Sequence, residues 1–463
     1  MAGRRTRFTV EAPRDGTAVT ERLAHPELQE RLDAADLEEL RRKVDDSLHR
    51  AGVTFGPRWF RVDPVPRVIE RQEWLELRTG IVQRVRALEA FVADAYGAQE
   101  IVKARVVPDR VLREADHYEA ELVGLRPPGG WIGVAGLDLL RAPDGHFAVV
   151  EDNLRTPSGA AYLLAARKAV DDALGWAPPE RADVRGALID ALGATLRAAA
   201  PPGVERPFAV LLTDGPSNVA YWEQRVLAEA VPIALVRLDQ LELRGTRLYA
   251  RRPAGHARPV DVVYRRTDED RLRDASGRLT PVAELILPAW TAGTVGLVNA
   301  FGTGVADDKV AHAYVEDMVR FYLGQEPILR SVGTYDLGDE GARAEALHRV
   351  DELVVKPRGG YGGRGVVVGP RAGRSERERA SRALREDPER HVAQETVWFS
   401  RHPTVVEGRL QPRHVDLRPF AYRAGEEVRV VPGGLTRVAF AADELVVNSS
   451  RGGGAKDTWV LSE

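Results

Sequence analysis

The chain has 463 residues, which is enough for two to four structural units around sizeable cores. Its 66 Lys and Arg residues nearly balance its 69 Asp and Glu residues, and the net charge of −3 argues against a general affinity for nucleic acid or an anionic membrane. The absence of cysteine excludes disulfides and thiolate chemistry, and the absence of a long apolar run or a signal-peptide core predicts a cytoplasmic protein without a membrane span.

The N-terminal part of the chain divides into two regions with different sequence patterns. Residues 1–20 are polar and basic, and we expect a disordered arm there. Residues 21–125 are mainly helical in pattern, with apolar residues recurring at helical spacing around Leu77, Val85 and Leu88. A Pro/Gly cluster at 127–130 ends this region, and two strand-like runs and a helix follow within residues 126–180.

Two strand-like runs flank the dipeptide Asp144-Gly145, which is a strong signal for a two-residue hairpin. Counting outward from that turn pairs Asp138 with Glu151, with their Cβ atoms about 5 Å apart. Asn153 falls on the same face as Glu151, because side chains along a strand alternate with period two.

Two facing carboxylates repel unless a cation lies between them, and oxygen ligands from Asp, Glu and Asn suit Mg²⁺. Asp138, Glu151 and Asn153 are therefore candidate metal ligands, and Arg155 can meet phosphate oxygens beside the metal. The alternative is an exposed hairpin whose carboxylates diverge into water.

A small α/β unit is predicted over residues 181–300. Apolar runs that begin at Phe208, Ala234 and Val260 have the pattern of buried parallel strands. Asn218, Arg265 and Arg266 follow such runs and are candidate substrate-binding residues, since arginines can clamp a carboxylate. Surface ion pairs are an equally good explanation of the two arginines.

A lysine at the end of an apolar strand precedes a glycine-rich loop within residues 301–463. Lys356 is costly to bury unless an anion meets it, and the glycines from Gly359 to Gly365, including Gly362 and Gly363, let backbone amides approach a phosphate. The loop is not a Walker A motif. A purely structural hairpin is the alternative, and the embedded lysine favours a nucleotide phosphate.

Other segments carry weaker signals. Gln394, Glu395 and Val397 lie where an apolar strand runs into a linker that can offer backbone groups to adenine. Asp307 and Asp308 open a helix and are explained by helix capping, which does not explain Lys309.

The C-terminal stretch has two further candidate anion contacts. Arg418 and Arg437 occupy strand patterns, for which a solvated outer face is the alternative. Asn448, Gly453 and Lys456 belong to a glycine-rich segment that can approach an anion or can form a flexible tail.

Together these motifs resemble those of the ATP-grasp superfamily of carboxylate–amine ligases, with one displacement. From Asp307 to Gly454 the motifs follow the usual order, but the Asp138…Glu151-x-Asn153 element, which should come last, comes first. That order resembles the circularly permuted ATP-grasp family over about residues 50–463. The stretches that carry the resemblance are 151–159, 304–309, 432–437 and 448–459.

The resemblance implies an α/β (α+β) fold, with residues 126–180 as the permuted Mg²⁺-binding part, 181–300 as a pre-grasp-like substrate unit and 301–463 as the nucleotide-binding lobes. It also implies that strands near Trp459 lie beside those near Asp138. The implied ATP contacts are Lys309, Lys356, the glycine-rich loop, Gln394, Glu395 and Val397. Arg437 and Arg155 are the implied catalytic arginines, with Lys356 beside them.

The implied activity is a ligase that uses ATP and Mg²⁺ to join small-molecule or peptide carboxylates and amines through an acyl phosphate. Alternatives are a phosphotransferase that stops at a phosphorylated product and a nucleotide-binding scaffold without turnover. The substrates and the oligomeric state are left open.

Overall fold

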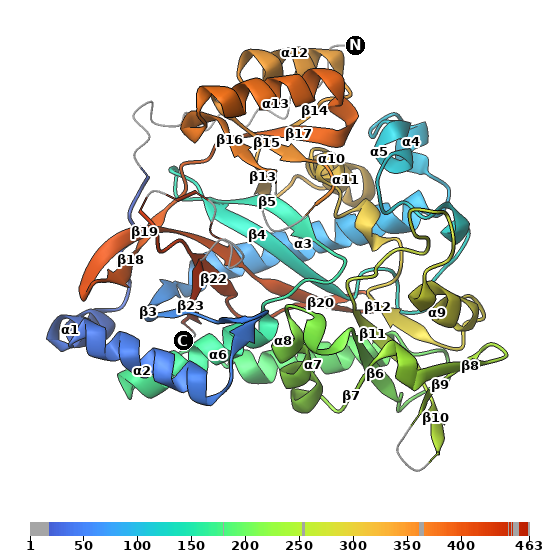
Figure 1. Ribbon diagram of the computed structural model, residues 1–463, viewed down its shortest axis with the longest axis horizontal. Coiled ribbons are helices and arrows are strands. Elements are labelled where there is room, and N and C mark those ends of the chain that lie inside the picture. The colour runs from blue at the N-terminus through green and yellow to red at the C-terminus, as the bar shows by residue number, and fades with distance from the viewer. Residues whose placement is uncertain are drawn as a thin grey trace.

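A large mixed sheet forms the centre of the protein, with a parallel sheet and an antiparallel sheet beside it (Figure 1). The computed structural model describes residues 18–178, 180–251, 255–360, 365–442, 444, 445, 447 and 453–461. The α/β fold class predicted from the sequence is confirmed. Residues 1–17, most of the predicted disordered arm, lie outside the described residues.

Within the described residues the central sheet has ten strands, in the order β13-β5-β4-β19-β22-β23-β3, with β18 paired to β19, and β20 paired to β4 and β21. Its strands are β3 (Val62–Ile69), β4 (Val134–Arg141), β5 (Phe147–Asn153), β13 (Arg330–Ser331), β18 (Arg401–Val406), β19 (Arg409–Arg418), β20 (Phe420–Ala424), β21 (Glu427–Val430), β22 (Leu435–Val438) and β23 (Gly454–Val460).

Trp459 and Asp138 lie in the same sheet, as expected, but they are not on adjacent strands. Trp459 lies on β23 and Asp138 on β4, and β19 and β22 lie between these two strands. Three strand spacings correspond to about 14 Å. The strand next to β23 on its other side is β3, which runs parallel to it.

Strand β3 interrupts the region that was predicted to be mainly helical. Its sequence contains Pro64 and Pro66, which weaken a strand pattern because proline cannot donate to the ladder. The structure accommodates both prolines because, among the strands of the described residues, β3 ends the sheet path and pairs only with β23.

Helices cover both faces of the central sheet. On one face, α6 (Ala160–Leu174) packs against β3 and β23, and α2 (Leu37–Arg50) packs against α6 and β3. On the other face, α3 (Arg71–Ala95) packs against β20 and β21. Leu137 and Leu139 of β4 belong to the apolar core on the α3 side, so the alternation of the strand sends Asp138 to the opposite face.

The three apolar runs predicted to be parallel strands do form a parallel sheet, of order β12-β11-β6-β7. Its strands and the elements next to it are β6 (Ala209–Thr213), β7 (Ala234–Val236), β11 (Val262–Arg266), β12 (Gly296–Val298), α7 (Val184–Ala198), α8 (Tyr221–Ala230), α9 (Pro281–Thr291), and the small sheet β8 (Leu241–Arg244), β9 (Arg247–Arg251) and β10 (Ala257–Pro259).

The antiparallel sheet has the order β14-β17-β15-β16 and is covered by α12 and α13 at the top of Figure 1. These elements are β14 (Thr334–Asp336), β15 (Leu353–Pro357), β16 (Val367–Val368), β17 (His391–Glu395), α12 (Glu340–His348) and α13 (Arg374–Glu386). Shorter elements are α1 (Pro26–Ala34), β1 (Thr54–Phe55), β2 (Arg58–Trp59), α4 (Glu100–Lys103), α5 (Asp109–Arg113), α10 (Lys309–His312) and α11 (Val315–Met318). None of the helices in the described part of the chain combines the length and the apolar character that a bilayer crossing requires.

Candidate active site

The β4–β5 hairpin places Asp138 directly opposite Glu151, as predicted, but through a different turn. The amide of Ala142 donates to the carbonyl of His146 at 2.9 Å, so the loop has three residues and ends at Gly145, whose φ is +88°. The register shifts by one residue between Leu139 and Asp138, which leaves Val150 as a bulge. The bulge compensates for the longer loop and restores the predicted pairing.

Asp138, Glu151 and Asn153 all line one large cavity of about 460 Å³. Their carboxylate and amide oxygens are the donor types that Mg²⁺ prefers. The Nδ2 atom of Asn153 is buried and has no hydrogen-bond partner in the described part of the protein. This NH₂ group is a donor, which a phosphate oxygen or a metal-bound water can satisfy, so this set fits a hydrated Mg²⁺ held together with phosphate oxygens.

Two arginines neutralise Asp138. Arg418 binds its carboxylate in a bidentate manner, at 2.6 and 2.8 Å, and Arg437 donates to Oδ2 at 2.8 Å. Arg437 also pairs with Asp416, the residue opposite it on β19. Burial alone would raise the pKa of Asp138, but the two guanidinium groups hold it below its usual range. These four side chains form a buried network with two positive and two negative charges.

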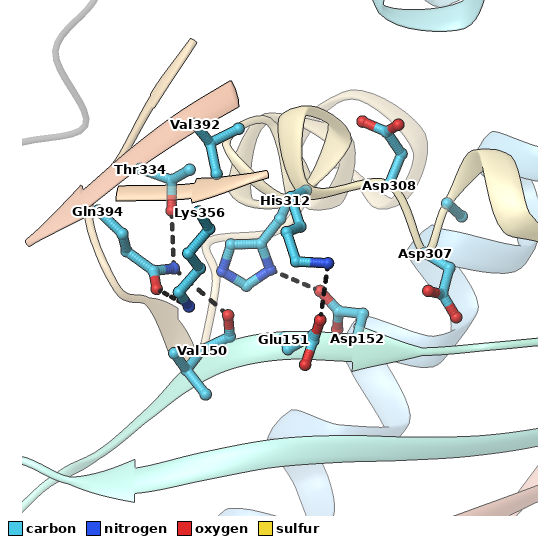
Figure 2. A pocket seen from close by; sticks show the side chains of 12 residues that line it. Val150, Glu151, Asp152, Asp307, Asp308, His312, Thr334, Lys356, Val392 and Gln394 are labelled. Atoms are coloured by element: carbon cyan, nitrogen blue, oxygen red, sulfur yellow. Dashed lines mark hydrogen bonds and ion pairs between the residues drawn. The ribbon is translucent and has the colours of Figure 1, made fainter. Parts of the chain in front are cut away.

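Lysines face the hairpin from α10 and from β15. Lys309 pairs with Glu151 at 3.1 Å and donates to the carbonyl of Gly360 at 3.0 Å. Lys356 donates to Oε1 of Gln394 at 2.5 Å, and Figure 2 shows the two side chains meeting above Val150. Among the described cations that line the cavity, Lys356 is the one without a carboxylate within ion-pair distance. Burial, with Lys309 nearby, lowers the pKa of Lys356 to about 8.

Asp152 points away from the cavity because it lies between Glu151 and Asn153 on the strand. Its carboxylate accepts two hydrogen bonds of 2.7 Å from Arg84 on α3. It also accepts one of 2.8 Å from Nδ1 of His312 on α10, which Figure 2 shows. This buried cluster fixes β5 against two helices and thereby orients the neighbouring Glu151.

The predicted adenine segment lies at one end of the cavity. Gln394, Glu395 and Val397 all line it. The Glu395 carboxylate itself pairs with Arg349 at 2.9 Å, so the segment can offer a ligand its backbone rather than this charge. The wall here is apolar and includes Val150, Val332, Val354, Val368, Val397, Leu445 and Val447.

Arg155 also lines the cavity, but carboxylates already neutralise its charge. It pairs with Asp270 at 2.9 Å and with Asp307 at 3.3 Å. Only Asp308 caps α10, through the amides of Val310 and Ala311. The capping explanation of Asp307 is therefore corrected: its Oδ2 accepts the amide of Leu154 at 2.6 Å and ties the end of the hairpin to the α10 segment.

The structure brings some predicted substrate residues to the cavity and leaves others out. Asn218, Arg266 and Arg418 line it. Arg265 is buried elsewhere and donates to the carbonyls of Asn299 and Ala300, and Lys456 is buried against Asp63 and the carbonyls of Val65 and Pro403. The described residues Gly365 and Gly453 are not part of the lining, and Gly362, Gly363 and Asn448 lie outside the described residues.

Other cavity residues were not predicted from the sequence. Asp416 has a signal, its period-two spacing from Arg418, but its partner Arg437 is 21 positions away on another strand. Asp270 and Phe55 carry no recognisable motif, and only the fold brings them to the cavity.

Sequence comparisons agree with this geometry. A family profile described as circularly permuted ATP-grasp type 2 matches residues 66–439. An uncharacterized protein of Mycobacterium tuberculosis is 42% identical over 447 residues, which cover 93% of this chain and 80% of that protein. An uncharacterized Synechocystis protein is 40% identical, over 90% of this chain and 89% of its own length.

A longer relative from Frankia alni is named "Putative glutamate--cysteine ligase 2-3". It is 42% identical over 95% of this chain, which spans 51% of its length. The profile match covers most of the chain and includes both the displaced hairpin and the arginine strands that neutralise it. The chain belongs to the circularly permuted ATP-grasp type 2 family.

Proposed function

We propose that this protein is an ATP-dependent carboxylate–amine ligase that forms an amide or peptide bond through an acyl phosphate and releases ADP and phosphate. The observation that carries the proposal is one continuous cavity that joins an apolar nucleotide end, an unneutralised lysine, an oxygen-donor set and two arginines. Family membership and the names of the Frankia relatives support the same class of reaction.

The nucleotide is expected to enter between the antiparallel sheet and the β4–β5 hairpin. The apolar wall and the Gln394–Val397 backbone would take adenine, and Lys309, Lys356 and the glycine-rich loop would meet the phosphates. Asp138, Glu151 and Asn153 would hold Mg²⁺, which when bound neutralises charge on the phosphate oxygens. When ATP binds, the ammonium group of Lys309 would leave Glu151 and pair with a phosphate, since one ammonium group cannot neutralise both.

The chemistry consists of two displacements. An oxygen of the substrate carboxylate attacks the γ-phosphorus, and the bond from that phosphorus to the ADP oxygen breaks. The amine nitrogen then attacks the acyl carbon, inorganic phosphate leaves with the electrons of the carbon–oxygen bond, and the nitrogen loses a proton. Arg437, and in second place Arg155, are proposed to stabilise the charge on the transferred phosphoryl group, since both line the cavity.

The test combines product analysis with a pair of hairpin variants. Amino acids, short peptides and polyamines are screened for ADP and phosphate release that requires both an acid and an amine, with mass spectrometry for the joined product. Glu151→Ala should abolish release, whereas Asp144→Asn, at the exposed tip of the same hairpin, should retain it.

Two outcomes would contradict the proposal. Formation of AMP would exclude the acyl phosphate. A stable phosphorylated acid that no amine consumes would indicate a phosphotransferase instead.

A further inference from the structure

The cavity extends past the oxygen-donor set to a wall made by two segments distant in sequence. Phe55 on β1 and Val219, just before α8, both line it, and the amide of Gly56 donates to the carbonyl of Val219 at 2.7 Å. Phe60 and Tyr162 support this wall, with ring centroids 4.5 Å apart. Figure 1 shows α6 and α8 on the opposite side of the β4–β5 hairpin from the antiparallel sheet.

Val219 is exposed although its neighbours are not. It is 50% exposed, whereas Asn218 and Ala220 on either side are 7% and 6% exposed. Apolar side chains that line a concave cavity are the kind of surface that ligand pockets present. Val219 and the half-buried Phe55 therefore offer an apolar surface that the described part of the chain leaves uncovered.

The charges at this end are unfavourable for an anion. Arg266 is neutralised by Glu223 at 2.9 Å, as Arg155 is by its two carboxylates. Asp268 lines the cavity rim and, within the described ranges, no cation lies within ion-pair distance of it. Its Oδ1 accepts a hydrogen bond from Asn218 at 3.0 Å, and the same amide group donates to Asp214 at 3.0 Å. An ammonium group would offset this local excess of negative charge, and a carboxylate would add to it.

We propose that this end of the cavity binds the amine substrate, and that this amine carries an apolar or aromatic skeleton and no carboxylate near its amino group. The inference rests on the proposed ligase function and names the class of its second substrate. Phe55 and Val219 contact the skeleton, and Asp268 faces the ammonium group. Glutamate and cysteine, which carry α-carboxylates, are poor amines for this site.

Binding is measured by calorimetry with L-phenylalaninamide, L-leucinamide and L-glutamate, on the full chain with Mg²⁺ and ADP present. L-Phenylalaninamide should bind more tightly than L-glutamate. Truncating a contacting aromatic side chain removes apolar contact area, so Phe55→Ala should weaken the binding of L-phenylalaninamide by about tenfold. Val219→Ser should weaken it less, and Asp268→Asn should weaken both amides.

Val123→Ser is the matched control, because Val123 is also about half exposed, at 51%, and does not line the cavity. It should leave amide binding unchanged, and ADP affinity should stay the same in all the variants. L-Glutamate binding more tightly than L-phenylalaninamide would overturn the inference, as would amide affinities that Phe55→Ala and Val219→Ser leave unaltered.

The two proposals can fail separately. If L-phenylalaninamide binds through Phe55 but no acid and amine are ever joined, the ligase proposal fails while the amine site stands. If ligation is observed only with amines that bear a carboxylate, the ligase stands and the amine site is wrong.

Discussion

At the residue scale, Lys356 should make the proposed binding of ATP depend on pH. It lies on β15 facing Glu151 and Asp138 from the hairpin and Lys309 and His312 from α10. Its pKa is lowered to about 8, chiefly by burial. The pKa of His312 is lowered too, so that ring is neutral where Lys356 titrates.

The ammonium form of Lys356 exists below its pKa, so the affinity for ATP should fall as pH rises from 7 to 9. Lys356→Met should remove this dependence and weaken ATP at pH 7 by about tenfold or more, since a charge-assisted hydrogen bond contributes about 1.5–3 kcal/mol. Titration calorimetry at several pH values measures both effects. If the ATP affinity of the Lys356→Met variant falls with pH as steeply as that of the parent, a group other than Lys356 is titrating.

Lys356 and the Asp138–Glu151 pair could be selected from the sequence because their signals are local. The first is a lysine in an apolar strand; the second is a count outward from a turn, which gives the right pairing because the bulge at Val150 offsets the longer loop. Their ion-pair partners could not be selected in this way. Asp138 is 280 residues from Arg418 and 299 from Arg437, and no periodicity links residues so far apart. Arg155 shows the same limit, because only the fold reveals that carboxylates already neutralise it.

At the scale of elements, the Arg84–Asp152 pair joins α3 to β5, and His312 adds α10. Both partners are almost fully buried, at 2% exposure each. Removing one member leaves the other charge buried and uncompensated.

Arg84→Met should therefore lower the free energy of unfolding by about 3–5 kcal/mol. Thermal melts and urea unfolding should both register the change. Arg78→Met, an exposed position on the same helix, should stay within about 0.5 kcal/mol of the parent. Equal stabilities for the two variants would show that the pair does not hold β5 against α3.

Element types followed from the sequence where the apolar pattern was continuous, as in the parallel strands β6, β7 and β11. The pattern failed at β3, whose two prolines hide a strand that the sheet accommodates at the end of its path. The order of the ten strands is set by packing between distant segments, which no local pattern contains.

At the scale of the whole molecule, Glu21 ties the first described residues to the central sheet. Its carboxylate accepts hydrogen bonds from Arg67 on β3 and Arg141 on β4, both at 2.8 Å, and from Ser400 at 2.6 Å. Burial would raise the pKa of Glu21, but the two arginines more than offset it and hold the pKa well below its usual range.

A carboxylate with a lowered pKa stabilises the fold above its unfolded pKa, and this stabilisation is lost as pH falls through the folded pKa. Melting temperature should therefore decrease as pH falls below about 4.5, and Glu21→Gln should lower it at pH 7 and flatten that part of the curve. Scanning calorimetry from pH 3 to 7 tests this. If melting temperature falls with pH equally in the parent and in Glu21→Gln, other carboxylates cause the acid sensitivity.

The separation of Asp138 from Arg418 and Arg437 also bears on synthesis. At ribosomal rates of about 5–20 residues per second, the 299 residues between Asp138 and Arg437 take about 15–60 s to translate. Through that interval the nascent hairpin carries its carboxylates without the guanidinium groups that later neutralise them. The cavity is lined in part by β19 and β22, so it is completed only when these late strands join the sheet.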